Sequence, residues 1–241
     1  MKKIFLLNFL FLFFSFCSCA QDFEKNQIEK KQLLKAVNAI NISSSFELYI
    51  SQGAEESVTV SAATQEFLDN IVIKVENGEL IIRYDIGNRF WKGWNTDRLK
   101  LKAFVSIKNL EKLTASGASE VYFEEGISGD NLTINLSGAS SLKGKLNAKK
   151  LNVHVSGASN MALHGVVTNL IVGASGASDF KGYNLVTDYC NTKTSGASTA
   201  NINVNKELNA TASGASSINY KGSGLIRDIR TSGASTISRK S

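Results

Sequence analysis

The sequence has 241 residues, of which 43% are hydrophobic and 20% charged, and its formal net charge is +6. This composition is typical of a globular protein large enough to bury a core. Its basic residues form no Lys/Arg-rich run of the kind that nucleic-acid binding requires, so we expect no nucleic-acid partner. Proline is absent while glycine occurs 19 times, so turns must depend on glycine and short polar residues.

Residues 1–20 have the order of a secretory signal peptide. Two lysines precede the apolar run Ile4–Phe16, which is too short to span a bilayer, and small residues follow it. Two processing sites fit: cleavage after Ala20, or lipidation of Cys19 in a loose bacterial lipobox. Both predict an exported protein of the periplasm, outer membrane or surface of a Gram-negative bacterium, with membrane contact only through the lipid anchor.

Residues 21–36 are polar and predict a linker or a short frayed helix. Residues 37–110 then show strand patterns bounded by turn residues. The expected strands are Phe46–Ile50, Val58–Val60, Ile71–Val75, Leu80–Tyr84 and Leu99–Val105. Asn77-Gly78 predicts a hairpin between the third and fourth of them. Because a stack of strands exposes unpaired edges, we expect this N-terminal region to continue or cap the repeat that follows.

An aromatic and basic loop interrupts this strand pattern. It consists of Arg89, Phe90, Trp91, Lys92 and Trp94, and it holds both tryptophans of the chain. Such side chains suit stacking on sugar faces or insertion into a partner's pocket. The alternative is that Phe90 and Trp91 fold back to cap the core. The loop is the one localised binding-site candidate in the sequence.

The tetrapeptide Ser-Gly-Ala-Ser recurs seven times in residues 111–241, at intervals of 18 to 21 residues. Residues five, three and one before its first serine are mostly apolar. The residue five after it is apolar in every copy: Val121, Leu142, Met161, Phe180, Ala200, Ile218 and Ile237. This period of two predicts strands with one buried face. Each unit is therefore a strand, a small-residue segment, a second strand and a turn such as Lys143-Gly144 or Lys181-Gly182.

One such unit cannot bury its apolar face alone, but stacked units can. A helical solenoid would need an apolar period of 3.6, and a propeller blade would need about twice as many residues. We therefore expect an all-β protein, a single-stranded parallel β-helix with about 19 residues per coil. Glycine can take positive φ at a corner, and serine hydroxyls can bond neighbouring backbone groups. Whether the glycine or the alanine faces the core stays open.

The repeated serines are interpreted as structural, because a nucleophile needs one activated serine with a base in reach. The structural residues are Ser116, Gly117, Ser137, Gly138, Ser156, Gly157, Ser175, Gly176, Ser195, Gly196, Ser213, Gly214, Ser232 and Gly233. His154 occupies an outward strand position, and neither it nor His164 has metal-pair spacing. After cleavage at Ala20 only Cys190 remains, at an inward position that predicts a small buried residue. No catalytic residue, metal or cofactor is expected.

The repeat, Ile50–Gly53 and Gly78–Ile82 together resemble the putative auto-transporter adhesin, head GIN domain family of Bacteroidetes-type bacteria. The likeness covers residues 37–237. It implies an all-β, right-handed parallel β-helix exported to the cell envelope, with an adhesin-like label and no catalytic residues to carry across. One departure is that family members often have a proline just before the first repeat, where this chain has Ile107–Leu110.

Three functions fit this sequence. The leading one is a non-enzymatic, adhesin-like module whose outer face binds a glycan or a protein partner. A polysaccharide-active β-helix enzyme would need clustered carboxylates at equivalent positions of adjacent coils, whereas the outward positions carry mainly Asn, Thr, Lys and His. The third is a structural envelope component without a ligand.

Overall fold

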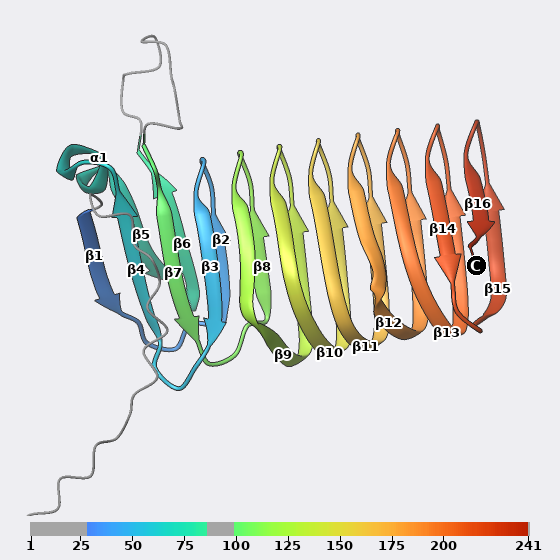
Figure 1. The fold of residues 1–241 in the computed structure, drawn as a ribbon, viewed down its shortest axis with the longest axis horizontal. Coiled ribbons are helices and arrows are strands. Elements are labelled where there is room, and N and C mark those ends of the chain that lie inside the picture. The colour runs from blue at the N-terminus through green and yellow to red at the C-terminus, as the bar shows by residue number, and fades with distance from the viewer. Residues whose placement is uncertain (1–27, 86–98, 241) are drawn as a thin grey trace, which may run out of the picture.

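A computed structural model describes residues 28–85 and 99–240. They form one elongated stack of β-coils, with the N-terminal strands at one end and the C-terminal strands at the other (Figure 1). The elements are β1 Ile28–Leu33, β2 Ala39–Ile42, β3 Glu47–Gln52, β4 Ser57–Ala62, α1 Gln65–Asp69, β5 Ile71–Glu76, β6 Glu79–Tyr84, β7 Lys102–Ile107, β8 Lys112–Ala115, β9 Glu120–Leu136, β10 Ser141–Val155, β11 Asn160–Ala174, β12 Asp179–Thr194, β13 Thr199–Ala212, β14 Ser217–Lys221, β15 Leu225–Thr231 and β16 Thr236–Arg239.

Each coil is flattened and has two corners (Figure 1). The sharp corner is the Ser-Gly-Ala-Ser tetrapeptide, and the broad corner lies near the middle of each long strand. In β10, a descending segment, Ser141–Leu146, leads from the sharp to the broad corner, and an ascending segment, Leu151–Val155, leads back. The pairing between coils is parallel, for example Leu142 with Met161. The predicted parallel β-solenoid is confirmed.

The glycine of the tetrapeptide is required by the close stacking of the sharp corners. Gly157 has φ +73°, and a Cβ on it would collide with the carbonyl oxygen of Gly138 in the preceding coil. This close approach allows the backbone N–H of Ala158 to donate to that same Gly138 oxygen at 2.8 Å. Only glycine combines positive φ with the absence of a side chain. The hydrogen-bonded ladder between coils therefore continues through the turn.

The last serine of the tetrapeptide is the residue that faces the core. Ser178 is 2% exposed, and its hydroxyl donates to the backbone oxygens of Ser175 at 2.8 Å and Val155 at 3.1 Å. These bonds satisfy a buried polar group and tie the turn to the coil beside it. The glycine and the alanine are both exposed at this corner. Neither of them faces the core.

The inward strand positions form a continuous apolar core between the two corners. The expected positions are buried in most coils, as with Leu132, Ile134 and Leu136 of β9. Cys190 is buried too, with its Sγ 3.0 Å from Oγ1 of buried Thr192. Burial raises the pKa of the Cys190 thiol to about 12.

The N-terminal region both continues and caps the stack. β2 and β3 form a coil against β8 and β9, in which Ser44, with φ +86°, takes the place of the corner glycine. The coil of β6 and β7 then stacks on β2 and β3, so the order in space departs from the order in the chain. Antiparallel β4 and β5 cover the edges of β7 and β6. This arrangement agrees with the expectation that the region continues or caps the repeat.

Local details differ from the sequence-based expectations in two places. Residues 28–33, expected within a linker or frayed helix, form β1 and pair antiparallel with β4. The turns expected at Lys143-Gly144 and Lys181-Gly182 are instead irregularities inside β10 and β12, where the pairing register shifts. In β10 and β12, the broad corner that follows contains no glycine. The Asn77-Gly78 hairpin between β5 and β6 is as expected, with positive φ at both residues.

Gly157→Ala tests the requirement at the sharp corner. The added methyl group forces an unfavourable φ and a backbone collision, so we expect the free energy of unfolding to fall by about 3 kcal/mol. Urea denaturation of residues 21–241 measures it, with Ala158→Ser as the control at the exposed neighbour. Equal stability of the two variants would show that the close approach is not a constraint.

The buried thiol gives a second prediction. Because the thiolate is the nucleophile, Cys190 of residues 21–241 should resist iodoacetamide at pH 8 and react only after denaturation. Mass spectrometry measures the labelled fraction, and Cys190→Ser is the blank. Rapid stoichiometric labelling of the native protein would contradict the buried position.

Candidate functional site

The repeat residues singled out in the sequence all lie at the sharp corners. They are Ser116, Gly117, Ser137, Gly138, Ser156, Gly157, Ser175, Gly176, Ser195, Gly196, Ser213, Gly214, Ser232 and Gly233. Their contacts are with the backbone of adjacent coils. His154 is exposed on the ascending segment of β10 and His164 on the descending segment of β11. Within residues 28–85 and 99–240, no group of three His, Cys, Asp or Glu side chains could hold a metal ion.

The aromatic and basic loop lies outside the described residues. Arg89, Phe90, Trp91, Lys92 and Trp94 all belong to the stretch 86–98, and binding by them stays a prediction. The lipidation candidate Cys19 also lies outside the described part of the chain. No helix in the parts that the structure does describe has the length and apolar character to cross a membrane.

A groove of about 790 Å³ opens on the descending segments of β11, β12 and β13. Its lining combines one aromatic ring, small apolar side chains and polar groups. The lining residues are Ala162, Leu163, His164, Gly165, Lys181, Tyr183, Asn184 and Asn201. Its size falls within the range of small-ligand sites, which are mainly apolar with a few convergent polar groups.

The groove arises where β12 departs from the repeat. Lys181 pairs with Asn201, but the next pair joins Val186 to Asn203. Four residues of β12, Gly182–Leu185, therefore lie opposite a single residue of β13. Leu185 stays buried in the core, while Tyr183 and Asn184 lie on the outer side of the strand. We refer to Gly182–Leu185 as the β12 bulge.

Two features hold the β12 bulge in place. A Cβ on Gly182 would lie 2.5 Å from the Phe180 ring and 2.8 Å from the Asn201 carbonyl oxygen, so only glycine fits there. In the next coil, Asn203 Nδ2 donates to the Tyr183 carbonyl oxygen at 3.1 Å. The bulge is thus fixed from the core side and from the neighbouring strand.

The Tyr183 ring provides the aromatic wall of the groove. Lys221 Nζ lies 5.5 Å from its centroid, at cation–π distance. Partial burial raises the pKa of Tyr183, so the ring keeps its neutral phenol at physiological pH. Within the described ranges, no hydrogen bond occupies the side chains of His164 or Asn184, which are exposed beside the ring. An aromatic surface next to unoccupied amide and imidazole groups can contact both the C–H groups and the hydroxyls of a sugar.

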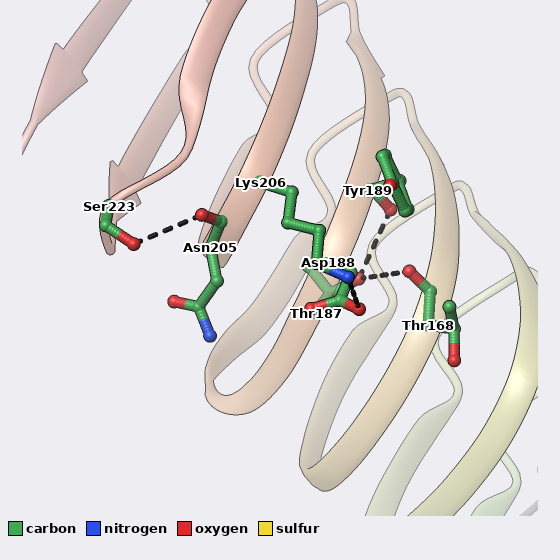
Figure 2. Close-up of polar contacts among 7 residues, drawn as sticks. All are labelled: Thr168, Thr187, Asp188, Tyr189, Asn205, Lys206 and Ser223. Carbon is green, nitrogen blue, oxygen red and sulfur yellow. Dashed lines mark hydrogen bonds and ion pairs between the residues drawn. The ribbon is translucent and has the colours of Figure 1, made fainter.

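The broad corners carry polar groups as well, but these bind one another. Figure 2 shows Thr187 donating to the carbonyl oxygens of Thr168 at 3.5 Å and Tyr189 at 3.2 Å. Lys206 forms an ion pair with Asp188 at 2.8 Å. The contacts of Thr187 with Thr168 and of Lys206 with Asp188 join adjacent coils and hold the corners together.

Two further hollows lie near the broad corners and are weaker candidates. One, of about 420 Å³, adjoins Tyr189 and Glu207, and Glu207 is paired with Arg227 at 2.6 Å. The other, of about 580 Å³, is lined by residues that include Glu111 and Asp130 and has no aromatic wall. Asn38 donates to Glu111 at 2.9 Å, and Lys149 pairs with Asp130 at 2.9 Å. The carboxylates of both hollows therefore already have protein partners.

A stack of aromatic rings on the outer face has a structural role. The rings of Phe104 and Tyr122 lie on either side of Tyr49, with centroids 4.9 and 5.1 Å away and nearly parallel planes. The faces between them cover one another and are closed to a ligand. Tyr49 donates to Glu47 at 3.0 Å, and burial, together with this carboxylate, raises the Tyr49 pKa to about 12. The stack supports the coils that lack the tetrapeptide.

The sequence analysis did not single out Tyr183 or Asn184. A signal was present in the repeat spacing, since the coil that starts at Ser175 has 20 residues and the one that starts at Ser195 has 18. A difference in coil length marks where one strand must bulge against its neighbour. The longer coil, which starts at Ser175 and contains Tyr183 and Asn184, was therefore where a bulge could have been predicted.

Solved structures share this fold. A putative adhesin from Bacteroides fragilis NCTC 9343 is 22% identical with a TM-score of 0.82, and the match covers 90% of this chain and 98% of that one. A putative adhesin from Parabacteroides merdae ATCC 43184 is 19% identical with a TM-score of 0.70, over 90% and 98%. A putative lipid binding protein from Parabacteroides distasonis ATCC 8503 is 18% identical with a TM-score of 0.70, over the same shares.

No curated protein matches the sequence. The family model described as putative auto-transporter adhesin, head GIN domain matches residues 36–224. This match spans the N-terminal coils and most of the tetrapeptide repeats, in agreement with the resemblance seen in the sequence. The chain belongs to the putative auto-transporter adhesin, head GIN domain family.

Proposed function

We propose that this protein is a non-enzymatic, exported, adhesin-like surface protein that binds glycans in the groove beside Tyr183. The observation that carries the proposal is the aromatic wall next to polar side chains with no protein partner among the described residues. Membership of an adhesin-head family supports an adhesin-like surface role. The signal-peptide pattern of residues 1–20 supports export, by either of its two processing routes.

The rigidity of the scaffold favours binding to a glycan over a role as a spacer without a ligand. The groove is built on paired strands, and Gly182 and Asn203 fix the bulge that forms it. A site preorganised in this way loses little conformational entropy when a ligand binds. A spacer would need no such departure from the repeat.

The chemistry of the groove also favours binding over hydrolysis. Glycoside hydrolysis uses a pair of carboxylic acids on either side of the scissile bond. The lining of the groove includes His164 and Lys181 but neither Asp nor Glu. A sugar chain bound in the groove would contact hydrogen-bonding groups, but the lining offers no carboxylic acid to protonate the leaving group and no carboxylate to act as a nucleophile.

A glycan array probed with residues 21–241 tests the proposal. Tyr183→Ala should weaken binding to the preferred glycan about tenfold, because a buried aromatic contact contributes about 1 kcal/mol or more. Tyr189→Ala is the matched control, since Tyr189 is 40% exposed at a broad corner. A Trp91→Ala/Trp94→Ala variant examines the loop predicted from the sequence.

Several outcomes would contradict the proposal. Binding that is lost in Trp91→Ala/Trp94→Ala but unchanged in Tyr183→Ala would move the site to the loop. Binding to no glycan at all would remove the glycan-adhesin function. Release of reducing ends from a soluble polysaccharide would make the protein an enzyme.

A further inference from the structure

A line of outward side chains runs along the solenoid axis through the groove. Lys143 pairs in register with Ala162, Ala162 with Lys181, and Lys181 with Asn201. Asn201 then pairs with Asn219, whose Nδ2 donates to the Asn201 Oδ1 at 3.1 Å. We call Lys143, Ala162, Lys181, Asn201 and Asn219 the outer line. Ala162, the smallest of these side chains, leaves room between two lysines.

The lysines of the outer line have no acidic partner in the described part of the chain. Lys143 and Lys181 are both exposed, and neither forms an ion pair with, or donates a hydrogen bond to, a carboxylate there. Lys221 adds a third cation at the groove, held over the Tyr183 ring. The one carboxylate close by in sequence is Asp179, two residues before Lys181 on the same outward face. The groove therefore carries an excess of positive charge.

At the broad corners, two lysines are paired with carboxylates of the preceding coil. Lys149 pairs with Asp130 of the preceding coil at 2.9 Å, and Lys206 pairs with Asp188 in the same way at 2.8 Å. Cross-coil pairs of this kind neutralise the surface there. Positive charge without a counter-charge, next to an aromatic wall, fits an anionic ligand that also has apolar C–H surface.

We propose that the groove takes an anionic saccharide, with the Lys143 and Lys181 ammonium groups contacting its carboxylate or sulfate groups and Tyr183 contacting its ring. This inference rests on the proposed glycan-binding function and adds the class of glycan. The two lysines lie two strand steps apart, about 9.6 Å. That separation exceeds one sugar ring, so anionic groups on different sugars of one chain, lying along the outer line, reach both lysines.

Three probes test the charge requirement by calorimetry: hexagalacturonate, its fully methyl-esterified form and a sulfated dextran oligosaccharide. The protein should bind at least one anionic probe about tenfold more tightly than the ester. Lys143→Gln/Lys181→Gln should reduce that anionic affinity about tenfold, because two exposed charge contacts are lost. Its affinity for the ester should not change.

The matched control is Lys150→Gln/Lys193→Gln, which removes the same charge from exposed positions of other segments. Tight binding of only the carboxylated or only the sulfated probe supports the inference and identifies the anion. An equal loss of affinity in the control would show general attraction to a basic protein and overturn the inference.

The remaining outcomes separate this inference from the proposed function. Equal affinity for hexagalacturonate and its ester, abolished by Tyr183→Ala, would overturn the anionic class and leave glycan binding intact. If the protein binds none of the three probes and no glycan on the array, both the anionic class and the glycan-binding function are overturned. Because the substituted lysines are exposed, the variants should melt at the same temperature as the parent protein, which circular dichroism verifies.

Discussion

The structure depends on the close approach of successive backbones at the sharp corner. At six of the seven repeats, the turn hydrogen-bonds to the turn before it, and a side chain on the glycine would prevent this. The inward serine completes the corner by satisfying its own hydroxyl against backbone oxygens, as Ser178 does. Ser44 takes the place of the glycine in the coil of β2 and β3, and the backbone N–H of Ala118 still donates to the Ser44 carbonyl oxygen at 2.8 Å. The tetrapeptide is thus a packing device.

A stack built in this way has a simple consequence for function. The core accepts a fixed number of inward residues per coil, so any surplus must leave through the outer face. The β12 bulge is such a surplus, and it converts a flat sheet surface into a groove with Tyr183 at its side. Elsewhere, some outward polar groups pair across coils, as at the broad corner of β12 and β13 (Figure 2). The regular parts of the molecule provide rigidity, and the irregular part provides a place to bind.

Much of the fold could be predicted from the sequence because a period of two and a fixed repeat length leave few alternatives. The inward positions before most of the tetrapeptides, the burial of Cys190 and the hairpin at Asn77-Gly78 followed from pattern alone. The spatial order of the N-terminal coils did not, since β6 and β7 stack outside β2 and β3 through pairing between distant segments. The groove was missed because glycine after lysine was interpreted as a turn. Whether a glycine at such a position forms a turn or a β-bulge depends on the pairing register of the neighbouring strand.

The most direct test of this account is hydrogen–deuterium exchange of residues 21–241 with and without the bound saccharide. Amides in the β12 bulge lie outside the regular pairing register, so they should exchange readily in the free protein. We expect the saccharide to slow exchange at residues 182–185 and to leave exchange at the sharp and broad corners unchanged. Slowing confined to residues 86–98 or to the corners, with none in the bulge, would contradict it.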